Sequence, residues 1–280
     1  MDLYYEFHSV AGSGSFGNIE LYRRKIDQRL VVIKKISLAC LTVKEEQGAY
    51  NEINVMSQLK HPNVISYHHW FMENRILCIV MEYAVGGSLQ NFIKQRENYL
   101  ISEPDVVYLL SQLVHGLHYI HKRGIMHRDL KPSNILLQNA GANIVVKIAD
   151  FGISKIQEGK TQAGTIVGTP CYLSPELCEG LPYNRSSDIW ALGCILYEMM
   201  TLKRAFDGQT LGSIVRKILL CQPSSPNTEI YSTLLRDLLG RLLNSDSTQR
   251  PSTAMIMADP AIAETFYKLY FEIGRIHDKF

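Results

Sequence analysis

The chain has 280 residues, of which 46% are hydrophobic and 20% charged, and its formal net charge at pH 7 is +2. This is the composition of an ordinary soluble globular protein with room for one large domain or two lobes and a sizeable core. No basic stripe of the kind that nucleic-acid binders carry is visible, so no nucleic-acid partner is expected.

Targeting and redox signals point to the cell interior. The six cysteines are scattered, with no C-x-x-C pair and no histidine spacing suited to zinc, which favours reduced thiols. The first residues have neither a basic start nor an apolar run, so no secretory signal is expected. The longest apolar stretch, near Ile189 to Met200, is too short to cross a bilayer. We therefore expect a soluble, intracellular protein without a membrane partner.

The first part of the chain is predicted to form strands. Residues from Tyr4 to Ile36 alternate between apolar and polar and are rich in β-branched side chains. Between the first two strands lies a glycine-rich run made of Ala11, Gly12, Ser13, Gly14, Ser15, Phe16, Gly17, Asn18 and Ile19. Glycines at this spacing let the backbone approach phosphate oxygens and offer N–H donors. Because the run lies between strands and not before a helix, it favours a phosphate-covering flap over a dinucleotide-binding turn.

Lys34 closes an otherwise apolar strand, Val31 to Lys34. Such a lysine either faces the surface or binds phosphate, and the glycine-rich run upstream favours phosphate. A helix is predicted from about Lys44 to Leu59, with an apolar stripe on one side. Gly48 near its start is less favourable than alanine by about 1 kcal/mol, so we expect a mobile N-terminal end.

Two further strands, a hinge and a long helix follow. The strands are predicted at Val64–Trp70 and Ile76–Met81, and the glycines after Val85 suit a hinge between two lobes. The run from Ser102 to Asp105 has the pattern of a capping box, opening a helix that ends before Gly124. The histidines of that helix are expected to be solvated or packed rather than metal-binding; they are His115, His118 and His121.

Carboxylates, an amide and cations lie close together in the middle of the chain, on Arg128, Asp129, Lys131, Asn134 and Asp150. The two neighbouring cations partner the charge of Asp129, which should therefore stay ionised. Asn134 and Asp150 offer hard oxygen donors of the kind that suit Mg²⁺, a metal that is usually shared with substrate phosphates. A carboxylate left free of metal could accept a hydroxyl proton. The set indicates phosphoryl transfer.

The run HRDLKPSN from His127 to Asn134, followed by Asp150-Phe151-Gly152, resembles the catalytic loop and metal-binding turn of the eukaryotic protein kinases. The resemblance makes Asp129 the catalytic base and Lys131 the cation near the transferred phosphate. It makes Asn134 and Asp150 the Mg²⁺ ligands. His127 and Phe151 resemble the packing residues that lock the loop.

The same resemblance implies an ATP site formed by the glycine-rich run together with Val32, Lys34, Met81, Glu82, Ala84 and Leu136. Lys34 would pair with Glu52 on the predicted helix and bind phosphate. The Glu82 carbonyl and the Ala84 N–H would hold the adenine edge, with Met81 behind the pocket and Leu136 as its floor.

Three positions depart from the usual kinase pattern. Ala11 is small where a larger aliphatic residue is common, and Val32 is bulkier than the usual alanine, so the adenine roof is expected to be reshaped but not abolished. Ser88 stands where Asp is common, which leaves a ribose or peptide contact there open.

A long polar loop from Ile153 to Thr169 precedes a Ser-Pro-Glu version of the Ala-Pro-Glu motif and resembles an activation segment. Lys131 together with Thr169 is the pairing of Ser/Thr kinases. Thr165, and after it Thr161, is the predicted site for an upstream kinase. A phosphate there would add nearly two negative charges within reach of Arg128 and order the loop.

Two structural roles are also implied. Asp188, near the start of the most apolar helix, suits the helix dipole and would accept hydrogen bonds from the catalytic-loop backbone. Arg250 would pair with Glu176.

The run from Val167 to Phe206, with 61–65 and 79–89, resembles the NIMA-related (Nek) branch, and matching residues cover roughly Tyr4 to Pro260. The implied fold is α+β: an N-lobe with an antiparallel sheet and one helix over 1–83, a mainly helical C-lobe over 84–262 and a C-terminal amphipathic helix over 263–280. The kinase domain itself would span about 4–262. By association the resemblance implies cell-cycle, centrosome, cilium or microtubule control, at cytoplasmic, cytoskeletal, centrosomal, ciliary or nuclear locations.

Apolar residues repeat at helical spacing from Ile262 to Ile276. This helix either packs on the lower lobe or binds a partner. The chain stops there without the coiled-coil or propeller tail that many relatives carry, so targeting is expected from the catalytic surface, this helix or another protein.

The leading hypothesis is an active protein Ser/Thr kinase that uses ATP and Mg²⁺ and acts on protein substrates. A catalytically silent pseudokinase scaffold is the alternative, but its usual signature is loss of the Lys, of the catalytic Asp or of the metal-binding Asp, and all three stand here. A small-molecule kinase is disfavoured by the Gly-Thr-Pro and Ser-Pro-Glu segments, which shape a peptide platform in the family.

Overall fold

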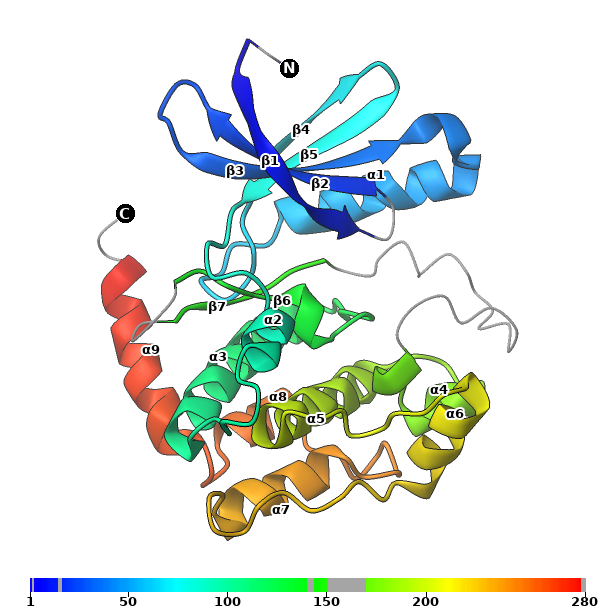
Figure 1. The fold of residues 1–280 in the computed structure, drawn as a ribbon, viewed down its shortest axis with the longest axis vertical. Coiled ribbons are helices and arrows are strands. Elements are labelled where there is room, and N and C mark those ends of the chain that lie inside the picture. The colour runs from blue at the N-terminus through cyan, green and yellow to red at the C-terminus, as the bar shows by residue number, and fades with distance from the viewer. Residues whose placement is uncertain (2, 15–16, 140–143, 151–169, 278–280) are drawn as a thin grey trace.

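The computed structural model describes residues 1, 3–14, 17–139, 144–150 and 170–277. They form two lobes, an upper one with a five-stranded sheet and a long helix and a lower one that is mainly helical (Figure 1). The α+β, two-lobed prediction is confirmed.

The upper sheet is antiparallel, with strand order β1-β2-β3-β5-β4. Its strands are β1 (Tyr5–Gly14), β2 (Gly17–Arg24), β3 (Leu30–Ser37), β4 (Tyr67–Glu73) and β5 (Ile76–Glu82). The glycine-rich run joins β1 to β2, and Gly12 lies opposite Ile19. Lys34 lies opposite Ile79, in the middle of the sheet.

The predicted strand Val64–Trp70 is wrong in its first three residues, because this apolar run belongs to the lower lobe. Val64 forms a parallel bridge with Ile148, and the Ile65 N–H donates to the Ile148 carbonyl at 2.9 Å. The strand β4 therefore begins only at Tyr67.

The helix α1 (Val43–Ser57) packs on the sheet and follows the short 3-10 turn Leu38–Cys40. It begins with a capping box between Thr42 and Glu45, which was not predicted. Mobility of its first turns remains a prediction.

The lower lobe is built of helices around one central member, α5, which is buried along most of its length. The helices are α2 (Leu89–Lys94), α3 (Glu103–Lys122), α4 (Pro175–Cys178), α5 (Arg185–Thr201), α6 (Leu211–Leu220), α7 (Thr233–Leu242), α8 (Thr253–Met257) and α9 (Ala263–His277). Short 3-10 turns cover Pro132–Asn134 and Pro170–Tyr172, and a two-stranded ribbon pairs β6 (Ile135–Leu137) with β7 (Val146–Ile148).

The predicted ends of α3 are confirmed with one change. Ser102 caps the helix through the Asp105 N–H, but the Asp105 carboxylate accepts from the Ser102 hydroxyl at 2.6 Å, so the reciprocal backbone bond of a capping box is not formed. Gly124 has φ +76°, a left-handed conformation that glycine adopts without strain, and it ends the helix.

The helix α9 runs along the outer side of the lower lobe beside α3 (Figure 1). Phe266 and Tyr270 contact the His115 ring, and Leu269 is buried. The packing reading of this helix is therefore confirmed. In the part of the chain that is described, none of the helices has the length and apolar character needed to cross a membrane.

Candidate active site

The two lobes are joined by an ion pair between Lys34 on β3 and Asp150, which follows β7. The Lys34 Nζ lies 2.7 Å from Asp150 Oδ1, and only 4% of Lys34 is exposed. Asp150 has φ +58°, a left-handed conformation that few residues other than glycine, Asn and Asp adopt and that is often held at functional sites. The side chain of Glu52 lies outside the described residues, so the Lys34–Glu52 pair stays a prediction.

The catalytic loop brings Asp129, Lys131 and Asn134 together. Asp129 Oδ2 accepts from Lys131 Nζ at 2.7 Å and from Asn134 Nδ2 at 3.0 Å. Asn134 Nδ2 also donates to the Asp129 carbonyl at 2.9 Å. The Arg128 guanidinium carbon lies 5.8 Å from the centre of the Tyr183 ring. Its predicted partnership with the Asp129 charge stays a prediction.

His127 joins this loop to the residue before Asp150. Its Nε2–H donates to the Ala149 carbonyl at 3.0 Å, and its Nδ1 accepts from the Asp129 N–H at 3.3 Å. Burial lowers the pKa of His127, so the ring is neutral at neutral pH and keeps one donor and one acceptor nitrogen. The Asp129 backbone is thereby fixed relative to Asp150.

Asp188, near the start of α5, holds the loop from below. Its carboxylate is fully buried and accepts from the backbone N–H groups of His127 at 3.0 Å and Arg128 at 3.1 Å, as predicted. His121 Nε2 at 2.7 Å and the Tyr183 hydroxyl also donate to it, and neither contact was predicted. Burial acts most strongly to raise the pKa of Asp188, but the His121 hydrogen bond and the surrounding donors outweigh it and lower that pKa.

The residues predicted to hold the nucleotide come from the inner strands of the upper sheet and from β6 in the lower lobe. Val32 pairs with Met81 across β3 and β5, and both are half-buried. Leu136 on β6 is half-buried and bridges to Ser88, the residue that caps α2. Met81 precedes the segment between the lobes that contains Ala84, and Leu136 bridges to the far end of that segment at Ser88. A shared nucleotide pocket remains a prediction. Ser15 and Phe16 lie outside the described residues.

A partly buried ion pair next to this segment was not predicted from the sequence. The Glu82 carboxylate contacts Lys147 Nζ at 2.9 Å and accepts from the Ser66 N–H at 3.0 Å. Because Glu82 ends β5 and Lys147 lies on β7, the pair fixes the hinge to the strand that leads to Asp150.

The donor set suits Mg²⁺. Asp150 offers a carboxylate, and the Asn134 amide, with its nitrogen turned to Asp129, offers its carbonyl oxygen. In the described part of the chain no cluster of three or more His, Cys, Asp or Glu side chains could hold a metal alone. Two protein oxygens supplemented by phosphate and water are what Mg²⁺ commonly uses.

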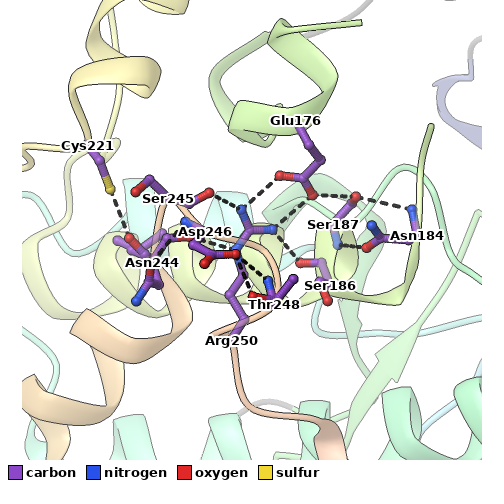
Figure 2. Close-up of polar contacts among 11 residues, drawn as sticks. Glu176, Asn184, Ser186, Ser187, Cys221, Asn244, Ser245, Asp246, Thr248 and Arg250 are labelled. Carbon is purple, nitrogen blue, oxygen red and sulfur yellow. Dashed lines mark hydrogen bonds and ion pairs between the residues drawn. The ribbon is translucent and has the colours of Figure 1, made fainter. Parts of the chain in front are cut away.

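Arg250 lies at the centre of a second buried network in the lower lobe (Figure 2). Its guanidinium makes two bonds to the Glu176 carboxylate, at 2.9 and 2.8 Å, as predicted. It also donates to the carbonyls of Asn244 and Ser186, both at 2.8 Å, while Ser187 donates to Glu176 at 2.7 Å. The network fixes α4, and with it the end of the segment that follows the catalytic loop, to α5.

A closed ring of hydrogen bonds supports β7 from the outer side. The Asn63 N–H donates to His61 Nδ1 at 3.1 Å, and His61 Nε2 contacts His115 Nε2 at 3.4 Å. His115 Nδ1 contacts Asn63 Oδ1 at 3.1 Å, and the Asn63 amide nitrogen donates to the Val146 carbonyl at 3.0 Å. The ring is complete only when both imidazoles are neutral, because an added proton places two donors face to face.

Acidification is therefore expected to destabilise the protein. Burial, and then the neighbouring His118, lowers the pKa of His115, so the unfolded state binds protons more readily and stability falls as the pH falls below about 6.5. The melting temperature should drop between pH 7.5 and 5.5. His115→Phe, which keeps a ring against Phe266 and Tyr270, should flatten that drop. An equal pH slope in the variant would contradict the role of the ring.

Removing the Lys34 charge is expected to abolish most phosphate transfer. Lys34→Met should lower the rate by on the order of 100-fold, because a preorganised cation at the phosphates is lost, without changing the circular dichroism. Lys35→Met is the matched control, since Lys35 lies next on the same strand and pairs with Glu20 at 2.8 Å. If initial-rate assays showed the same loss of phosphate transfer in both variants, Lys34 would have no specific role in the site.

Comparison with known proteins decides the family. The model of the protein kinase domain matches residues 5–262. The chain belongs to the protein kinase family. Its relatives place it in the NIMA-related branch of Ser/Thr kinases. It is 45% identical to serine/threonine-protein kinase Nek8 of Danio rerio over 97% of this chain and 39% of that protein. It is 38% identical to serine/threonine-protein kinase nekl-2 of Caenorhabditis elegans over 97% of this chain and 78% of that protein.

A third relative is the probable serine/threonine-protein kinase nek3 of Dictyostelium discoideum, 43% identical over 94% of this chain and 24% of that protein. This NIMA-related chain thus spans well under half the length of two of these three relatives.

Proposed function

We propose that this NIMA-related chain is an active protein Ser/Thr kinase that uses ATP and Mg²⁺. The observation that carries the proposal is the joint placement of Asp129, Lys131 and Asn134 beside the Lys34–Asp150 ion pair. The usual signature of the pseudokinase alternative is loss of the Lys, of the catalytic Asp or of the metal-binding Asp, and Lys34, Asp129 and Asp150 all stand here.

In this proposal each side chain has one task. Mg²⁺, when bound through Asp150 and Asn134, supplies charge neutralisation at the phosphates. Lys34 binds phosphate oxygens from the upper lobe. Asp129 orients the Ser or Thr hydroxyl of the substrate and accepts its proton as the oxygen attacks the γ-phosphorus. Lys131, already 2.7 Å from Asp129, offsets the charge that develops on the transferred group. Most of the acceleration would come from positioning and fixed charge.

Regulation and cellular role are proposed from the family. Thr165 and Thr161, which lie outside the described residues, are the proposed acceptors for an upstream kinase. Control of the cell cycle, centrosome, cilium or microtubules is proposed by association with the Nek branch. For α9, whose outward aromatics Tyr267 and Phe271 are 61% and 68% exposed, partner binding remains a proposal beside its packing role.

The test is phosphate incorporation from labelled ATP into the protein itself and into a general Ser/Thr substrate. Incorporation is expected only with Mg²⁺, lost on its removal with EDTA, and confined to serine and threonine. Mapping to Thr165 or Thr161, with reduced activity in Thr165→Ala, would identify the switch. Incorporation that persists without a divalent cation would contradict the proposed chemistry.

A further inference from the structure

Tyr183 lies between α4 and α5, and its side chain contacts two groups that control the catalytic loop. Its hydroxyl donates to Asp188 Oδ1, and the Arg128 guanidinium carbon lies 5.8 Å from its ring centre. Asp188 in turn holds the backbone of the loop. One tyrosine therefore contacts both the anchor of the loop and the side chain next to Asp129.

The hydroxyl acts as a donor. A buried carboxylate only accepts, and burial, followed by the Asp188 charge, raises the pKa of Tyr183 well above its usual value, so the proton stays on the phenol at neutral pH. Each carboxylate oxygen of Asp188 accepts two hydrogen bonds. Oδ1 accepts from the Tyr183 hydroxyl and the Arg128 N–H. Oδ2 accepts from the His121 ring and the His127 N–H. Loss of the hydroxyl would remove one of the two donors at the oxygen that holds Arg128.

Arg128 needs such support, because its backbone is strained. Its φ is +68°, the left-handed region that side chains rarely adopt and that is unfavourable by roughly 1–2 kcal/mol. Two contacts keep the Arg128 backbone from relaxing to a more favourable φ. They are the hydrogen bond from its N–H to Asp188 at 3.1 Å and the cation–π contact of its side chain with Tyr183. Because Arg128 and Asp129 share a peptide bond, a rotation at Arg128 moves the Asp129 carboxylate.

We propose that Tyr183 is a positioning residue for phosphoryl transfer, which holds Arg128 through its ring and through Asp188 and so fixes the direction of Asp129. The proposal rests on the proposed kinase function. It assigns Tyr183 no contact with ATP or substrate.

The experiment compares Tyr183→Phe, which removes only the hydroxyl, with Tyr183→Leu, which removes the ring as well. Tyr231→Phe is the matched control, since that buried hydroxyl donates to the Ile101 carbonyl at 2.7 Å, far along the chain from the catalytic loop. We expect kcat to fall roughly ten-fold in Tyr183→Phe and on the order of 100-fold in Tyr183→Leu, with both KM values within about two-fold of wild type. The control should lose thermal stability but keep its kcat.

Two further readouts separate positioning from a merely structural role. In a protein that already carries Arg128→Met, Tyr183→Leu should lower kcat little further, because both substitutions remove the contact between the Arg128 side chain and the Tyr183 ring. Amide exchange at His127 to Asp129 should accelerate in both Tyr183 variants and not in Tyr231→Phe. Unchanged exchange, additive losses, or a kcat loss no larger than that of the control would overturn the proposal. The exchange measurement needs no turnover, so it tests whether Tyr183 fixes the catalytic loop even if the wild-type protein transfers no phosphate. Absence of phosphate transfer by the wild type would reject the proposed kinase function, not the role of Tyr183 in fixing the loop.

Discussion

Asp129→Asn is expected to lower kcat by on the order of 100- to 10,000-fold, the range that a positioned general base contributes. Asparagine keeps the shape and the contact with Lys131 but cannot accept the substrate proton. Because Lys34 and Asp150 are untouched, nucleotide affinity should change by less than about three-fold. Initial rates with a Ser/Thr peptide and an independent nucleotide-binding titration measure the two effects separately.

Asp237→Asn, on the exposed side of α7, provides the control for loss of a carboxylate elsewhere and should be as active as the wild type. An Asp129 variant that keeps more than about a tenth of the wild-type kcat would show that Asp129 does not act as the base.

Arg250→Met is expected to destabilise the protein by about 3–5 kcal/mol, because it leaves the Glu176 carboxylate buried without its cation. Glu176 is 5% exposed and Arg250 6%, and the guanidinium also stacks 5.0 Å from the Trp190 ring centre. The melting temperature should fall by about 10 °C. Thermal unfolding followed by circular dichroism measures it.

Lys268→Met is the matched control, since Lys268 and Glu264 form an ion pair with side chains 69% and 83% exposed. It should leave the melting temperature unchanged, as exposed pairs contribute little. If Arg250→Met had the same melting temperature as this control, the network in Figure 2 would have no structural role.

The sequence predicts best what is local. Asp129, Lys131 and Asn134 lie within one short run, so their spacing alone brings them together. The Ser102 cap and the Gly124 stop are likewise readable from neighbouring residues. The Thr42–Glu45 capping box also has a local signal, a Thr followed by a Glu at the spacing of that motif, although it was not predicted.

What could not be predicted depends on contacts between distant residues without a local pattern. His121 and Asp188 are separated by 67 positions, and Glu82 and Lys147 by 65. Val64 was predicted to begin the strand Val64–Trp70, but its bridge to Ile148, 84 positions away in the sequence, places it in the lower lobe. Nothing in the sequence around Tyr183 distinguishes it from other loop tyrosines. Its contacts with Asp188 and Arg128 are visible only in the structure.

The most direct test of the account is the rate of phosphate transfer from ATP to a Ser/Thr peptide with saturating Mg²⁺, measured for wild-type protein and Asp129→Asn after exposure to an activating kinase. The account predicts phosphoserine or phosphothreonine with the wild type and almost none with the variant, at equal nucleotide occupancy. Nucleotide binding without any transfer by the wild-type protein would contradict it and favour a scaffold.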